Sequence, residues 1–186
     1  FTSVSPYNAS TVLAHNAIVA FDAATGAISS TFAPTVVGGS VLSILPGPTS
    51  DEVYVGGSFS SIDGVASRVA LLNVTTGAIA AGWTSPSVNG EVEAIQRADS
   101  RLFVGGEFTS VGGKSRPGLV SLDATSGAVT SYAQLSFTGH HNYGTKCDPT
   151  KQTCADGGTG VHAIAINPAA TKMVVIGNFI NVGTAS

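Results

Sequence analysis

The sequence predicts an all-β protein, a β-propeller present as a partial arc of about three blade equivalents. A Gly-Gly-x-Phe phrase recurs along the chain, the last time with Ile in place of the first Gly, and involves Gly56, Gly57 and Phe59, then Gly105, Gly106 and Phe108, then Gly177 and Phe179. Turns that run from Asp or Asn to Gly recur at 22–26, 73–77 and 123–127. The period of about 50 residues, with four strand-like segments in each repeat, is that of a propeller blade.

The composition agrees with many short strands. Charged residues are only 10 % of the 186 residues, while 43 % are hydrophobic and 23 are Gly. This balance favours strands joined by tight turns over disorder, which requires high charge and low hydrophobicity. The eight Lys and Arg residues are scattered in a chain of net charge −3, so we expect no nucleic-acid partner. We also expect no transmembrane segment, because no apolar run approaches the ~20 residues that span a bilayer.

The repeat divides the chain in order. We expect a half-blade at 1–34, a complete blade at 39–85, a second at 90–136, an insertion at 137–159 and a further half-blade at 160–186. Propellers close with about four to eight blades, so the two half-blades should belong to different blades. The expected partners are therefore the remaining blades of the same longer chain or neighbouring protomers.

The strands of a blade follow from local pattern. The first strand is expected at 39–44, 90–95 and 160–164; its third copy is one residue shorter between Gly and Val, which predicts a bulge or register difference there. The second strand, at 52–56, 101–105 and 172–177, is rich in β-branched and aromatic residues. A third strand precedes each Asp/Asn–Gly turn and a short fourth strand follows it. The glycines and Phe of the repeated phrase are expected to pack between neighbouring blades.

At these residues the chain resembles the delta-sixty repeat family of bacterial β-propellers. The shared phrases are Val53–Phe59 with Arg68 and the 71–77 turn, and Leu102–Phe108 with Arg116 and the 122–127 turn. The first repeat departs from the pattern, with Tyr7–His15 inserted. The resemblance implies a large secreted or surface protein without a common assigned activity. Kelch-like propellers are the next nearest likeness, but the copper ligands of galactose-oxidase-type propellers have no matching positions.

The insertion at 137–159 is the expected ligand-binding loop. Cys147 and Cys154 predict a disulfide, which implies an oxidising compartment. The candidate binding residues are His140, His141, Tyr143 and Asp148. A zinc site on the two histidines and two cysteines is disfavoured, since adjacent histidines rarely bind one ion and the cysteine spacing is unusual for zinc. Calcium is disfavoured because the acids are not clustered. We therefore expect no cofactor.

Catalytic carboxylates are a further possibility. Glycoside hydrolysis requires two of them across a pocket, and the candidates are Asp51, Glu52, Glu91, Glu93, Asp99 and Glu107. Glu91 and Glu93 should share one strand face, and the equivalent positions of the other repeats are not acidic. A solvated strand face is the simpler interpretation. His162 lies on a strand, and its repeat partners, Leu42 and either Val92 or Glu93, suggest no role for it.

The pattern as a whole favours a secreted or cell-surface, non-catalytic binding or scaffold module, with an extracellular glycan or a surface protein as its ligand. One alternative is part of a carbohydrate-active extracellular enzyme whose catalytic residues lie on other blades. Another is the protomer of a surface filament or assembly.

Overall fold

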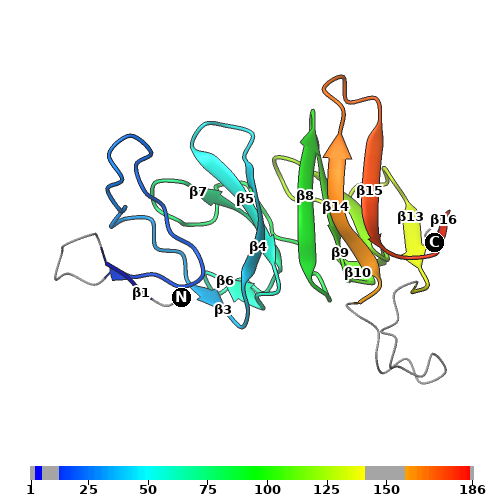
Figure 1. Ribbon diagram of the computed structural model, residues 1–186, viewed down its shortest axis with the longest axis horizontal. Helices are drawn as coiled ribbons and strands as arrows, with labels where there is room; N and C mark the ends of the chain where they lie inside the picture. The colour runs from blue at the N-terminus through cyan, green and yellow to red at the C-terminus, as the bar shows by residue number, and fades with distance from the viewer. Residues whose placement is uncertain (1–2, 6–12, 141–157, 185–186) are drawn as a thin grey trace.

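The computed structural model describes residues 3–5, 13–140 and 158–184, and Figure 1 shows their arrangement. The described residues form strands and turns without a helix, in small antiparallel sheets. None of them therefore forms a helix long and apolar enough to cross a membrane. The predicted all-β fold class and partial propeller arc are confirmed.

Three successive sheets form the arc. The first blade contains β4 (Val41–Pro46), β5 (Glu52–Gly57) and β7 (Val69–Asn73), in the order β4-β5-β7. The second blade repeats this order with β8 (Val92–Ala98), β9 (Arg101–Gly106) and β12 (Leu119–Asp123). The third blade is partial and contains β14 (Gly160–Ile166) and β15 (Met173–Asn178). In Figure 1, β8 lies between β4 and β14, so the first strands of the blades stand side by side.

The predicted turn chemistry is present in all three repeats. The side-chain oxygen Oδ1 of Asp22, Asn73 and Asp123 each accepts hydrogen bonds from two following backbone N–H groups and one hydroxyl. The glycine that ends each turn has a positive φ of 72–78°. These local bonds close the hairpin without help from distant residues.

The prediction of a full fourth strand in each repeat is wrong. In place of a full strand, each repeat has a single antiparallel bridge, joining Leu72 to Ile79, Leu122 to Val129, and Phe21 to Ile28. In the first blade the reason is visible just after the bridge. The Trp83 N–H donates to the Ala80 carbonyl, and this turn takes the chain off the sheet edge and carries the Trp83 side chain into the core.

Short pairings tie each blade to the chain that precedes it. The β3 strand (Val36–Val37) pairs with β6 (Ser61–Ile62), and β13 (Leu135–Thr138) pairs with β16 (Asn181–Thr184). A Val88–Val111 bridge is the equivalent in the second blade. Phe137 and Thr138, the first residues of the predicted insertion, therefore lie in a strand.

A second short pairing follows the repeated phrase. The β10 strand (Ser110–Val111) pairs with β11 (Lys114–Ser115), and the repeat-equivalent β1 (Ser3–Val4) pairs with β2 (Leu13–Ala14). Each pair is antiparallel, and the connection between the two strands is longer in the first repeat, where β2 itself lies within the Tyr7–His15 segment.

The bulge predicted for the third repeat is present, but the same bulge also occurs in the other two. The register shifts between Val41 and Ser43, between Val92 and Ala94, and between Val161 and Ala163. Each shift leaves one residue without a partner on the neighbouring strand. These three bulge residues are Leu42, Glu93 and His162.

Blades meet through the repeated glycines. A Cβ on Gly56 would approach Ile95 Cδ1 of the second blade to 2.8 Å, and a Cβ on Gly105 would approach Val161 Cγ1 of the third blade to the same distance. Phe59 and Phe108 are buried in the two larger apolar clusters. Phe179 instead packs edge-on against Phe137, with ring centroids 4.8 Å apart.

The two ends of the arc expose apolar side chains. Val174 and Ile176 are 64 % and 63 % exposed, whereas the equivalent position to Val174 in the first blade is the fully buried Tyr54. At the other end Ile44 is 63 % exposed, while its equivalent Ile95 is 6 % exposed against the first blade. These residues occupy positions that are covered wherever two blades meet.

Candidate carboxylate–histidine site between two blades

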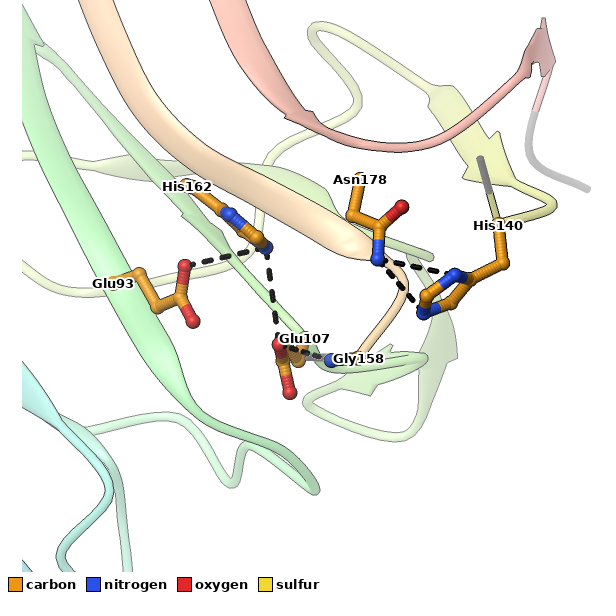
Figure 2. A network of polar contacts seen from close by, with 6 residues as sticks. All are labelled: Glu93, Glu107, His140, Gly158, His162 and Asn178. Carbon is orange, nitrogen blue, oxygen red and sulfur yellow. Dashed lines mark hydrogen bonds and ion pairs between the residues drawn. The ribbon is translucent and has the colours of Figure 1, made fainter. Parts of the chain in front are cut away.

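Three polar side chains converge between the second and third blades, as Figure 2 shows. Glu93 comes from the bulge in β8, His162 from the bulge in β14, and Glu107 follows the last residue of β9. His162 Nε2 lies 3.6 Å from Glu93 Oε2 and 3.8 Å from Glu107 Oε1. One ligand atom from each residue lies within 4.8 Å of the other two. We call this group the Glu93–Glu107–His162 cluster.

The repeat explains why these side chains meet. A bulge leaves its extra residue outside the strand pairing and turns its side chain away from the regular alternation. Glu93 and His162 are bulge residues of adjacent blades, and Glu107 occupies the variable position of the Gly-Gly-x-Phe phrase. The equivalent residues between the first and second blades are Leu42, Ser58 and Glu93. The same scaffold thus brings together three ligating residues at one blade junction and only one at the other.

The Glu107 side chain is held in place from the third blade. Its Oε1 accepts a hydrogen bond from the Gly158 N–H at 2.5 Å. A Cβ on Gly158 would overlap the Glu107 carboxylate. Glycine at 158 therefore allows the backbone to approach closely enough to fix this carboxylate.

The cluster is partly shielded from water. The side chains of Glu93 and Glu107 are each 23 % exposed and that of His162 is 37 % exposed. Burial raises the pKa of the Glu93 carboxyl above its ordinary value; His162 opposes this rise, while Glu107 and Glu91 add to it. His162 Nε2 is itself shielded and has no hydrogen-bond partner among the described residues.

Only part of the predicted binding loop can be placed. His140 follows β13, and its Nε2 lies 2.7 Å from Nδ2 of Asn178, the last residue of β15. Figure 2 shows this pair in the same region as the cluster. The predicted ligands His141, Tyr143 and Asp148, and the cysteines of the predicted Cys147–Cys154 disulfide, lie outside the described residues.

The other predicted carboxylates do not join the cluster. Glu91 precedes β8, and its backbone carbonyl accepts a hydrogen bond from the Glu107 N–H at 3.0 Å. Glu52 Oε2 accepts a hydrogen bond from Thr49 Oγ1 at 2.8 Å, within a turn. Asp51 and Asp99 also lie at turns that connect the first two strands of a blade. Of the six candidates, the structure brings together Glu93 and Glu107.

His162 is the member to which sequence reasoning assigned no role. Its repeat alignment is ambiguous because the spacing from Gly to Val is one residue shorter in the third repeat. When the three bulges are aligned, His162 matches Glu93 and Leu42. The residue at this position thus differs in every blade, and this difference indicates a site at one junction. Two carboxylates with an imidazole can bind a cation, or hydrogen-bond a hydroxyl-rich or amine ligand.

Comparison with known proteins supports the architecture. Residues 18–143 match the family model described as the Rax2 C-terminal beta propeller domain, which is more than half of the chain. This match supports a β-propeller and does not separate the delta-sixty type of repeat from the kelch-like type. No curated protein and no solved structure matches the chain.

Proposed function

Because the chain belongs to the Rax2 C-terminal beta propeller domain family, we propose that it is a non-catalytic binding and scaffold module of a secreted or cell-surface protein. The observation that carries this proposal is the contrast between fixed and varied positions in the repeat. The turn residues and inter-blade glycines recur, while the bulge residues and the variable position of the phrase bring two carboxylates and an imidazole together at one junction. A rigid scaffold that varies a few exposed positions is a common way to present a binding site.

The proposed location rests on the sequence. Cys147 and Cys154 are close enough in sequence to close a loop as a disulfide, which persists in an oxidising compartment. The repeated phrases also resemble those of delta-sixty proteins, and this resemblance implies a secreted or surface-bound protein. Labelling of intact cells with a membrane-impermeant biotin reagent tests the location. Labelling only after lysis would contradict it.

The open apolar ends suggest how the module is completed. We propose that Val174 and Ile176 at one end, and Ile44 at the other, are covered by further blades of the same chain. Support comes from the repeat itself, because the equivalent positions Tyr54 and Ile95 are buried by a neighbouring blade. Neighbouring protomers, as in a surface filament, are the alternative occupant. A full-length polypeptide that is monomeric by light scattering and carries further repeats supports the first arrangement; assembly through these ends supports the second.

A second candidate function follows from the Glu93–Glu107 pair. Two carboxylates close together, one with a raised pKa, are the groups that a retaining glycosidase uses. The rival proposal is therefore part of a carbohydrate-active enzyme, with its remaining residues on other blades.

One experiment separates binding from hydrolysis. The full-length protein and its Glu107→Ser variant are applied to a glycan array and to a panel of chromogenic glycosides. Binding without turnover supports the binding module, and turnover that is lost in Glu107→Ser supports the enzyme. The absence of glycan binding leaves a protein ligand, which surface cross-linking on intact cells would identify; failure there too would overturn the binding function.

A further inference from the structure

We propose that Glu93, Glu107 and His162 form a binding site for one divalent transition-metal ion of the Zn²⁺ class, which joins the second and third blades. The inference concerns the metal site alone and does not rest on the proposed location or on a glycan ligand. Neither the sequence pattern nor the family match assigns a metal to these residues.

The distances within the cluster fit an ion better than direct bonds. His162 Nε2 lies 3.6 Å and 3.8 Å from the two carboxylate oxygens, which is beyond hydrogen-bond range. Ligands that surround Zn²⁺ tetrahedrally at about 2.1 Å stand about 3.4 Å from one another. The two distances from His162 Nε2 thus exceed this value by only a few tenths of an ångström, and the two carboxylate oxygens, which lie within 4.8 Å of each other, would close the remaining gap around the ion.

The charges favour a cation at this point. The two carboxylates face each other in a partly buried position, and among the described residues neither forms an ion pair with Lys or Arg. The shielded Nε2 of His162 has no hydrogen-bond partner among the described residues. A divalent ion would offset the repulsion between the carboxylates and be bound by Nε2 of His162.

Neighbouring contacts resemble the support that metal ligands usually receive. The Gly158 N–H hydrogen bond fixes the Glu107 carboxylate, as outer groups commonly orient a ligating carboxylate. The donors come from two sheets, since Glu93 and Glu107 belong to the second blade and His162 to the third. Bound metal should therefore stabilise the junction between these blades.

The donor set selects the class of metal. One imidazole and two carboxylates suit Zn²⁺ and similar transition-metal ions, whereas Ca²⁺ and Mg²⁺ prefer oxygen ligands alone. Three protein ligands would leave at least one position for water or for a group from a bound partner.

The repeat supplies substitutions that this scaffold already tolerates. His162→Leu introduces the residue found at the same bulge in the first blade, and Glu107→Ser introduces the residue found at the same position of the phrase. Gly158→Ala retains all three ligating residues but displaces the Glu107 carboxylate. Glu91→Ser is the matched control, because it removes a neighbouring carboxylate that is not in the cluster.

The test is isothermal titration of the EDTA-treated full-length protein with ZnCl₂ and, separately, with CaCl₂. Co²⁺ absorption spectra report on the ligands, and circular dichroism checks that each variant is folded. We expect one Zn²⁺ per chain at this site and weaker binding of Ca²⁺. Affinity should fall about tenfold or more in His162→Leu, Glu107→Ser and Gly158→Ala. Glu91→Ser should change it less than about twofold.

Two results would overturn the proposal. One is Zn²⁺ binding that is unchanged in folded His162→Leu and Glu107→Ser but lost when Cys147 and Cys154 are replaced by Ser, which would place the ion on the insertion. The other is the absence of Zn²⁺ binding to the unaltered protein at millimolar metal, which would leave His162 and the two glutamates as a proton-dependent ion pair only. If His162→Leu does not fold, Gly158→Ala and Glu107→Ser decide the question.

Discussion

Tyr54 connects the first two blades, and Tyr54→Phe tests its contribution. The side chain is fully buried, packs edge-on against Trp83 with ring centroids 5.7 Å apart, and donates its hydroxyl to the Ala124 carbonyl of the second blade. Phenylalanine keeps the ring and its packing but leaves that carbonyl without this donor. Loss of one buried partner costs about 1–2 kcal/mol of unfolding free energy at neutral pH.

The same hydroxyl predicts a dependence on alkaline pH. Burial raises the pKa of Tyr54 from 10.0 to about 12, with Arg97 opposing the rise. A folded-state pKa above the unfolded value means that the contribution of Tyr54 is complete below pH 10 and is lost as the pH rises toward 12. Since one pKa unit corresponds to about 1.4 kcal/mol, the full loss is about 3 kcal/mol. The Tyr54→Phe variant has no phenol to ionise at this position, so the stability difference should shrink above pH 10 and reverse near pH 11–12.

The measurement is urea unfolding followed by the fluorescence of Trp83, the single tryptophan of the sequence, at pH 7, 9, 10, 11 and 11.5. Groups common to both proteins cancel in the difference between them. Tyr132→Phe is the matched control, because it removes a phenol hydroxyl from a side chain that is 52 % exposed. A difference in unfolding free energy between the unaltered protein and Tyr54→Phe that stays constant from pH 9 to 11.5 would refute the assignment of a buried, hydrogen-bonded phenol.

Three further predictions concern the scaffold. Gly56→Ala should destabilise the protein by about 1–3 kcal/mol in urea unfolding, because its Cβ would meet Val92 and Ile95, whereas Gly183→Ala, with nothing within 4 Å, should be nearly neutral. Asp123→Ala should cost about 1–2 kcal/mol through loss of its turn hydrogen bonds, and Asp123→Asn should cost little because Asn73 makes the same bonds. The hydrogen bonds from Ser126 lower the pKa of Asp123 below 3.8, so its charge contributes stability above pH 3.8 that is lost as the pH falls through the lowered value. Asp123→Asn should therefore be less acid-sensitive in pH titrations of unfolding. In the isolated 186-residue chain, Val174→Thr with Ile176→Thr should reduce concentration-dependent association measured by light scattering, whereas Val65→Thr, away from that face, should not.

The blade pattern could be predicted because its signals are local. An Asp or Asn that hydrogen-bonds its own following backbone, and a Gly at positive φ, specify a turn wherever they occur. The glycines of the repeated phrase likewise mark the points of close approach between blades. The length of the fourth strand was less predictable, since it depends on where Trp83 finds space in the core. No feature of the segment 78–81 alone encodes that choice.

The candidate site could be predicted only in part. Glu93 and Glu107 are recognisable as candidate carboxylates, but they stand beside four other acids because sequence gives no distance between blades. His162 was hidden because an alignment of Gly160 with Gly90 places it opposite Val92, and only the strand pairing shows that it matches Glu93. The expectation of one exceptional bulge followed from a shorter Gly–Val spacing, yet all three blades have it. The shorter spacing has another cause, because Gly160 pairs with Asn178 and so occupies the position of Ser40 and Glu91 in the other repeats.

The bulge explains how a highly regular protein can acquire a distinct site. Regular strand residues must pair and alternate, so a change there disturbs the blade. The bulge residue has no strand partner, and the variable residue of the phrase follows the end of β9, so both can change with little effect on the sheet. Each junction combines the bulge and phrase residues of one blade with the bulge residue of the next. Leu42, Ser58 and Glu93 give a junction with one ligating group; Glu93, Glu107 and His162 give one with three. Function in such an arc is therefore best sought at junctions, because a single repeat contains only part of each candidate site.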